Sequence, residues 1–439
     1  MSKISDFKIA DGTLFEYVGT GGVVVIPDGV ISIGYRSFVN RTDVTEVVIP
    51  DSVVEIGDNA FEKCKGLTEI SIPDSVIEIG SCAFKECTGL TKVVIPNSVT
   101  KINARAFSDC TSLTDIVIPD SVVEIEFGSF KYSGLTRITI PGNVKKIGSH
   151  AFYSCKRLTN IVFSEGLKEI DNSAFSECSH LKEFSIPRSL TSIGSGAFSC
   201  CGALRSIKIP GTIREINGAT FENCYRLKCV EIYDGVRTIG DCAFEGCSRL
   251  EYVSIPDSIE IIGNKAFRNC TRLAKINIPD SVKLIGIWAF NNTDIFYDES
   301  NRRDGALYIG NHLIDTDDAL SGEYVIKPGT KSIAGGVFYR NNYIERVIIP
   351  DSVEKIGRAA FSECSSLKTI EVPNGVTYIG KSAISFCKSL TDIVIPDSVT
   401  EIDNYSVCNY ENLTIHAHAG SYAEKYATEN NIPFEPINQ

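Results

Sequence analysis

Two closely spaced histidines near the end of this 439-residue chain are the first side chains that could support chemistry. His416 and His418 are separated by one residue, so a strand would place both imidazoles on the same face, where they could bind a metal ion. A further ligand group is not evident nearby. The alternative is a structural role for both histidines in the C-terminal segment.

Cysteine is the second candidate, because eleven of the sixteen cysteines lie in one regularly spaced column. Thiolates bind soft metals and take part in redox reactions, so a metal or redox function is one interpretation. The other is core packing, since a buried cysteine behaves as a small apolar residue. Five cysteines outside the column are better candidates for exposed thiols, although nothing near them predicts activation: Cys82, Cys200, Cys229, Cys242 and Cys408.

Carboxylates near a third histidine could form a hydrolytic or metal-dependent centre between residues 288 and 333. The side chains in question are Asp294, Asp298, Glu299 and His312. No phosphate-binding loop, dinucleotide fingerprint, zinc-protease helix or serine-hydrolase elbow is present anywhere in the chain. We therefore expect no catalytic residue, no metal ligand and no cofactor, and the hydrolase remains the least favoured alternative.

These residues are embedded in a sequence that repeats about every 23 residues, as in IPDSVVEIGDNAFEKC followed by IPDSVIEIGSCAFKEC and IPNSVTKINARAFSDC. An isoleucine recurs sixteen times from Ile33 to Ile402, with a phenylalanine five residues later and a cysteine three residues after that in most units. A unit this short cannot enclose a core alone, so each must bury its apolar residues against its neighbours. The sequence predicts a solenoid of 16 coils.

Within one coil, residues 67–72 alternate apolar and polar side chains before Pro73, which predicts a short strand followed by a turn. Residues 76–79 predict a second extended segment. Residues 83–90 have the three-to-four spacing of one helical turn. Each coil is therefore predicted to be strand, turn, strand and short helical turn.

The pattern LxxIxIPxSVxxIGxxAFxxC resembles the leucine-rich repeats of the BspA-like family over nearly the whole chain. The resemblance implies a right-handed leucine-rich-repeat solenoid, mainly β with short helical turns. It also implies association with cell surfaces, adhesion and binding of host matrix proteins. Asparagine usually follows the strand in leucine-rich repeats, but serine stands at this position here: Ser52, Ser75, Ser98, Ser121 and Ser258.

Three segments break the period and define the predicted domains. The segment DGALYIGNHLI resembles the opening DGTLFEYVG, so an opening-type module is expected to be reused inside the chain. Ser421 and Glu424 form a capping-box pattern ahead of a short helix. The predicted division is an N-terminal hairpin cap at 1–22, repeat array at 23–293, an inserted hairpin module at 294–325, further array at 326–412, and a C-terminal cap at 413–439.

Composition limits the partners and the location. A formal net charge of −12 disfavours nucleic acid and anionic membranes, because both attract clustered lysine and arginine. No apolar run is long enough for a signal peptide or a membrane span, which predicts a cytoplasmic protein without membrane insertion. The family resemblance implies the cell surface instead.

The stacked strands should form a parallel sheet face roughly 75 Å long, since neighbouring strands lie about 4.8 Å apart. Outward positions on this face vary along the chain, as a recognition surface requires, although β-branched residues also simply suit strands. Trp288, the only tryptophan, is expected to pack against the inserted hairpins, with an exposed binding anchor as the alternative. The candidate partner-binding residues are Glu69, Lys92, Arg137, Lys208, Tyr252, Lys275 and Arg346.

The sequence thus predicts a non-enzymatic scaffold that binds a protein or glycan partner through the strand face, with an adhesin-like role implied by the resemblance. A self-associating structural protein is the alternative, because exposed strands can pair between copies. The oligomeric state stays open.

Overall fold

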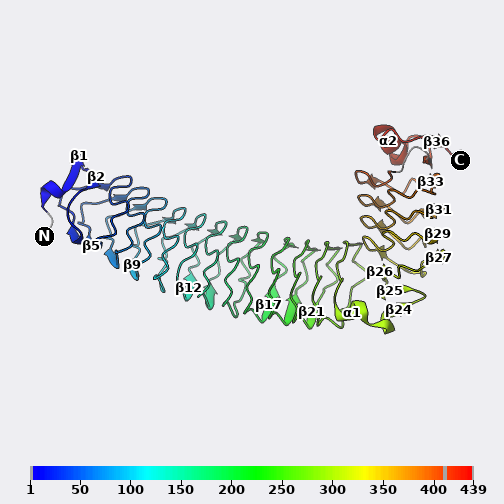
Figure 1. The fold of residues 1–439 in the computed structure, drawn as a ribbon, viewed down its shortest axis with the longest axis horizontal. Coiled ribbons are helices and arrows are strands. Elements are labelled where there is room, and N and C mark those ends of the chain that lie inside the picture. The colour runs from blue at the N-terminus through cyan, green and yellow to red at the C-terminus, as the bar shows by residue number, and fades with distance from the viewer. Residues whose placement is uncertain (1–2, 409–412, 438–439) are drawn as a thin grey trace. The chain divides into compact units, whose positions relative to one another are not determined.

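The computed structural model describes residues 3–408 and 413–437 (Figure 1). The chain forms two compact units: unit 1 comprises Met1–Glu231 and Gly246–Leu250, and unit 2 comprises Ile232–Glu245 and Glu251–Gln439. Both are solenoids of stacked coils with little helix, and about 18 turns follow one another at intervals of about 23 residues. The predicted solenoid fold is confirmed.

One side of each coil is formed by the strand that precedes the repeated proline, here called a face strand. In unit 1, β5, β9, β12 and β17 lie along one side, and in unit 2 β27, β29, β31 and β33 are stacked in the same way (Figure 1). Neighbours run parallel and in register, as Glu69 of β7 pairs with Lys92 of β9. The face strands are β3 (Gly22–Val25), β5 (Val44–Val48), β7 (Glu69–Ser71), β9 (Lys92–Val94), β12 (Arg137–Ile140), β14 (Asn160–Phe163), β17 (Ser206–Ile209), β19 (Cys229–Ile232), β21 (Tyr252–Ser254), β27 (Gly322–Val325), β29 (Ile344–Ile348), β31 (Thr369–Glu371), β33 (Asp392–Val394), β35 (Thr414–Ala417) and β36 (Phe434–Pro436).

A second side carries short strands that end at the isoleucine column. They are β4 (Ser32–Ile33), β6 (Glu55–Ile56), β8 (Glu78–Ile79), β10 (Lys101–Ile102), β11 (Glu124–Ile125), β13 (Lys146–Ile147), β15 (Glu169–Ile170), β16 (Ser192–Ile193), β18 (Glu215–Ile216), β20 (Thr238–Ile239), β22 (Ile261–Ile262), β23 (Leu284–Ile285), β28 (Ser332–Ile333), β30 (Lys355–Ile356), β32 (Tyr378–Ile379) and β34 (Glu401–Ile402). Leu14 pairs with Ile33 in the same way, and Leu313 pairs with Ile333. Leucine at these two positions explains why counting isoleucines finds sixteen coils and the structure about 18.

The third side consists of consecutive turns, so the predicted helical turn is wrong. Cys82 and Glu86 have left-handed backbones with φ of 57° and 58°. Left-handed residues aim backbone N–H groups out of the coil, and Cys82 donates to the carbonyl of Ala104 in the next coil. Phe84 donates to Ala106 in the same way. A helix would close its hydrogen bonds within one segment, whereas these turns join each coil to its neighbour.

Aromatic stacking fills the core. Phe61, Phe84 and Phe107 are fully buried, with ring centroids 5.3 and 5.4 Å apart and planes within 5° of parallel. The serine position of the repeat also joins coils, because Ser75 Oγ donates to the carbonyl of Val53 at 2.7 Å. A serine ladder therefore takes the place of the usual asparagine.

Antiparallel hairpins open the chain and recur inside it. The first follows η1 (Ile4–Asp6) and joins β1 (Phe7–Ala10) to β2 (Thr13–Tyr17). Its turn at Asp11-Gly12 has positive φ at both residues, as expected for a tight hairpin. The second instance follows α1 (Asp294–Tyr297) and η2 (Glu299–Asn301) and comprises β24 (Arg302–Arg303), β25 (Ala306–Ile309) and β26 (His312–Thr316).

Both instances share details beyond their strand order. Each hairpin has a register shift, between Lys8 and Ile9 in the first and between Leu307 and Tyr308 in the second. The face strands that follow each also begin with a shift, after Gly22 and after Gly322. The expected reuse of an opening module is therefore visible in the backbone.

The C-terminal segment contains α2 (Tyr422–Glu429). Ser421 Oγ accepts a hydrogen bond from the N–H of Glu424, and the Glu424 carboxylate accepts from the N–H of Gly420. No helix in the described residues is both long and apolar enough to cross a membrane. The domain boundaries stay predictions, and those at 1–2, 409–412 and 438–439 lie outside the described residues.

Candidate partner-binding face

Two columns of side chains point outward from the face strands. In β9, Lys92 and Val94 are exposed while Val93 between them is buried. The first column is polar in most coils, and the second carries many valines. The most exposed valines of the second column in unit 1 are Val48, Val94, Val117 and Val162, at 41%, 58%, 74% and 50% exposure.

Charges on the predicted face are paired between neighbouring coils. Glu69 and Lys92, two of the predicted residues, bind each other at 3.1 Å. Arg137 binds Asp115 at 2.9 Å, and its guanidinium lowers the pKa of that carboxyl. Exposed pairs of this kind contribute only about 0–1 kcal/mol each to stability. Their main consequence is a face with little net charge despite the acidic composition.

In unit 2 the predicted residues do not form one cluster. Tyr252 of β21 is 55% exposed, and Lys275 is exposed in a segment without a regular strand. Arg346 of β29 binds Glu323 at 3.2 Å and Glu371 at 2.8 Å, so it bridges three coils. The structure thus places all of these side chains outward, at separate points of the unit.

Unit 1 has a groove along its strand face, which brings two predicted residues into one feature. One hollow of about 740 Å³ is lined by residues from Asp115 to Ser164, including Arg137. The next hollow, of about 690 Å³, extends to Lys208. Both are lined by Asn160 and Val162, so they form a continuous strand-face groove.

Two phenylalanines that sequence analysis missed shape this groove. Phe163 and Phe184 are partly exposed on its wall, and their rings meet edge to face at 5.9 Å. Both stand where most coils have a buried isoleucine or valine, and the larger rings coincide with a break in the sheet. Beyond β14, the next coil contributes only an isolated bridge between Asn160 and Glu183. The signal was present in IVFSEG and FSIP, which depart from the usual IxIPD.

The two C-terminal histidines bind carboxylates of different coils. His416 Nε2 lies 2.9 Å from Asp392, and its Nδ1 lies 3.7 Å from Glu435. His418 Nδ1 lies 2.8 Å from Asp397. Within residues 3–408 and 413–437, no three histidine, cysteine or acidic side chains are grouped as metal ligands. The pair therefore serves here as a set of contacts that hold β35 against the preceding coil.

The column cysteines are hydrogen-bond donors in the core. Cys64 Sγ donates to the carbonyl of Phe38 at 3.0 Å, and Cys110 Sγ donates to the carbonyl of Phe84 at 3.2 Å. Burial raises the pKa of Cys64 to about 12, which keeps the thiol protonated. A protonated, buried thiol is a poor nucleophile and metal ligand, so the geometry favours the packing interpretation.

The candidate hydrolytic residues of the inserted segment have structural roles. His312 is fully buried, with Nδ1 2.9 Å from Ser332 Oγ and Nε2 3.1 Å from the carbonyl of Pro279. Asp294 begins α1, and Asp298 caps η2 by accepting from the N–H of Ser300. No shared centre results from these contacts.

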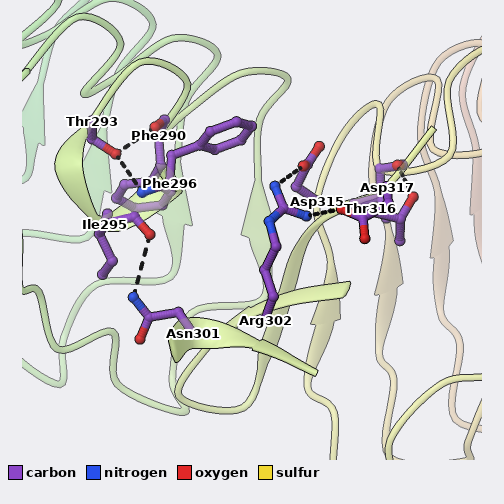
Figure 2. A network of polar contacts seen from close by, with 10 residues as sticks. Phe290, Thr293, Ile295, Phe296, Asn301, Arg302, Asp315, Thr316 and Asp317 are labelled. Atoms are coloured by element: carbon purple, nitrogen blue, oxygen red, sulfur yellow. Dashed lines mark hydrogen bonds and ion pairs between the residues drawn. The ribbon is translucent and has the colours of Figure 1, made fainter. Parts of the chain in front are cut away.

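A different ion pair organises this segment, as Figure 2 shows. Arg302 binds Asp315 at 2.8 Å and Asp317 at 2.7 Å, which ties β24 to the end of β26. Nearby, Thr293 Oγ1 donates to the carbonyl of Phe290 and accepts from the N–H of Phe296, which fixes the start of α1 (Figure 2). Burial raises the pKa of Asp315, although the Arg302 guanidinium acts against this shift.

Trp288 is 50% exposed, so the inserted hairpins do not bury it. Lys265 Nζ and Arg268 Cζ each lie 5.7 Å from the centre of its ring. The expected packing is limited to one small cavity of about 90 Å³, which Trp288 shares with Phe296 and Ile314. The alternative of an exposed aromatic anchor agrees better with this geometry.

Comparison with protein families gives one match. A model described as "BspA type Leucine rich repeat region (6 copies)" matches residues 13–135, 100–228, 197–297 and 324–425, which is most of the chain. No curated protein matches the sequence significantly.

Several solved structures are similar. A leucine-rich cell surface protein from Faecalibacterium prausnitzii is 32% identical, with 61% of this chain and 91% of that chain covered and a TM-score of 0.38. A leucine-rich repeat protein from Bacteroides ovatus is 27% identical over 98% of this chain and 97% of that chain, with a TM-score of 0.41. One from Eubacterium ventriosum is 24% identical over 65% of this chain and 91% of that chain, with a TM-score of 0.44.

Proposed function

Because this chain belongs to the BspA-type leucine-rich repeat family, we propose that it is a non-enzymatic scaffold that binds a protein partner through the strand face. The strand-face groove of unit 1 is its main contact. The observation that carries this proposal is the coincidence, in one groove, of two half-buried phenylalanines and the most exposed valines of the face.

The chemistry of the groove suits a protein better than a glycan. Val117 and Val162 present branched apolar surface, and Phe163 and Phe184 present aromatic edges. Apolar and aromatic side chains at the centre of a patch, with polar groups around it, are typical of protein–protein contacts. An aliphatic or aromatic side chain of the partner would remove these groups from water.

The surrounding charges support specificity rather than affinity. Arg137 and Asp115 bind each other at the edge of the groove, as Lys208 and Glu231 do beyond its other end. A partner that offers charges of both signs can exchange for these contacts, whereas a uniformly charged one meets an equal number of like charges.

The test uses the purified chain, a protein-array binding screen, and affinity measurements on the partner recovered. Val117→Asp places a charge at the most exposed valine, and we expect affinity about 30-fold lower, the loss of a hot spot worth about 2 kcal/mol. Val123→Asp is the matched control, because Val123 lies six residues further along in the same coil, outside the groove, and is 48% exposed.

Two further variants test whether unit 2 takes part. Tyr252→Ala and Arg346→Ala remove predicted residues of its strand face. Loss of affinity in either extends the site into unit 2. A partner that binds all three strand-face variants as tightly as the unchanged protein would rule out this face.

The adhesin-like role remains part of the proposal. The resemblance to BspA-like proteins implies a surface location, and protease protection of the native protein on intact cells tests it. Self-association is a competing outcome of the same screen: recovery of a second copy of the chain, with mass that rises with concentration, would replace the heterologous partner.

A further inference from the structure

A second hollow lies in unit 2 among the turns rather than on the strand face. Its volume is about 560 Å³, within the range of roughly 300–1,000 Å³ that is usual for small-molecule sites. It is lined on one side by turns that precede the inserted segment, at 241–242, 264–265 and 287–288, and on the other by turns that follow it. We call it the Trp288 hollow.

The inserted segment creates this hollow by bringing non-consecutive coils together. The N–H of Gly335 donates to the carbonyl of Ile285, a bond that other coils make to the coil directly before them. A Cβ on Gly335 would lie 2.7 Å from Cγ1 of Ile287, so only glycine permits this approach. The hollow is thus a consequence of the restart of the array, and no single coil contains it.

Two aromatic departures from the repeat converge here. Trp288 has φ of 57° at a turn position where other coils have residues such as Asn59, Cys82 or Ser173. Phe386 has φ of 60° at the second left-handed position, which Asn223 occupies in another coil. Both point outward, at 50% and 42% exposure, and both line the hollow although almost one hundred residues separate them.

The polar groups of the hollow include donors and acceptors in balanced number. Asp241 accepts from the backbone and side-chain amides of Asn264. Glu363 accepts from Tyr339 Oη at 3.1 Å and from Arg340 at 2.9 Å. These contacts hold both carboxylates in place before any ligand arrives, which reduces the cost of binding.

Charge and hydrogen-bonding capacity select the ligand class. The carboxylates of Asp241 and Glu363 are offset by the cations of Lys265 and Arg358, which also line the hollow. A charged ligand would therefore meet two like charges. A hydroxyl both donates and accepts, so a neutral ligand with several hydroxyls can use both kinds of group.

We propose that the Trp288 hollow binds a neutral pyranose saccharide, with a sugar ring packed against Trp288 and Phe386 and its hydroxyls bound by the polar groups between them. Aromatic rings offer a flat apolar surface to the C–H face of such a ring, and exposed tryptophan gains most from being covered. This site is independent of the strand face.

The sole tryptophan provides the assay. The full chain is titrated with the methyl glycosides of glucose, galactose, mannose and N-acetylglucosamine and with their disaccharides, while Trp288 fluorescence and calorimetric heat are followed. We expect a saturable change for at least one neutral sugar, and protection of the nearby Cys242 thiol from alkylation at the same concentrations.

Matched variants decide whether the signal comes from this hollow. Phe386→Asn installs the residue that Asn223 already provides at the same left-handed position, so the coil should fold, and affinity should fall at least about tenfold. Tyr132→Asn is the control, because Tyr132 has φ of 59° and 41% exposure at the equivalent position in unit 1. It should leave affinity unchanged.

Three results would overturn the proposal. No saturable signal from any neutral sugar rejects the ligand class. Binding that survives Phe386→Asn rejects the site. A response confined to adenosine or to charged sugars such as sialic acid assigns the hollow to another ligand. Because Val117→Asp should leave sugar affinity unchanged, failure here and failure of the strand-face proposal are distinguishable.

Discussion

Replacing Phe175 by alanine tests the idea that the aromatic stack both holds the coils and supports the groove. Phe175 is fully buried between Phe152 and Phe198, with centroid distances of 4.9 and 5.3 Å and planes within 3° of parallel. Its ring also meets Phe163 of the groove edge to face at 5.7 Å. One side chain thus joins three coils to the proposed contact surface.

The expected cost follows from these contacts. Truncation of a buried phenylalanine to alanine costs about 3–5 kcal/mol, and each aromatic pair lost adds about 0.5–1.5 kcal/mol beyond its buried area. We expect about 4 kcal/mol of local destabilisation. Because each coil contacts only its neighbours, the loss should be confined to the adjacent coils.

Hydrogen exchange measures this locally, which a single melting temperature of a repeat protein does not. Amides of residues 152–198 should lose about a thousandfold in protection, while those of coils 61–107 keep theirs. Phe175→Ile is the matched control, since Ile384 fills the same column position, fully buried, in another coil. A uniform loss along the whole chain, or a loss under tenfold, would falsify the local-stack reasoning.

Three further predictions concern other parts of the core. Cys110→Ala should cost about 1–3 kcal/mol, because it leaves the carbonyl of Phe84 buried without its donor, and Cys110→Ser should recover part of the loss in denaturant unfolding. His312 has its pKa lowered by burial, so the unfolded chain binds the extra proton, and unit 2 should lose stability as the pH falls below about 6.5; His312→Gln should remove this dependence from melts between pH 7 and pH 5. Arg302→Ala should destabilise the inserted hairpin by about 1–3 kcal/mol at pH 7 and by less in acid, where Asp315 is protonated, as hydrogen exchange of residues 302–316 can show.

The parts of the fold that were predicted correctly depend on short-range patterns. The spacing of isoleucine, phenylalanine and cysteine predicted the stacked coils, Asp11-Gly12 predicted the first hairpin, and Ser421 with Glu424 predicted the cap of α2. Each of these signals acts within a few residues or repeats at a constant interval, so a single sequence is enough to recognise it.

The helical turn was predicted wrongly because its apolar spacing is ambiguous. The spacing from Ala83 to Cys87 suits one face of a helix, but it equally suits side chains that point inward from consecutive turns. The choice depends on whether the backbone bonds within the coil or to the next coil. In the solenoid, a neighbouring coil is always in reach, and Cys82 therefore adopts the left-handed conformation that pairs it with Ala104.

The sequence by itself thus determined the repeated unit, the buried columns, the two hairpins and the outward direction of the variable residues, because these depend on local spacing. Only the tertiary structure decided which distant departures from the repeat meet. Phe163 and Phe184 open a groove because rings larger than isoleucine interrupt the sheet, and Trp288 and Phe386 meet because the inserted segment lets non-consecutive coils contact each other. Neither meeting has a signature in the linear order of residues, since each is a property of how the coils stack.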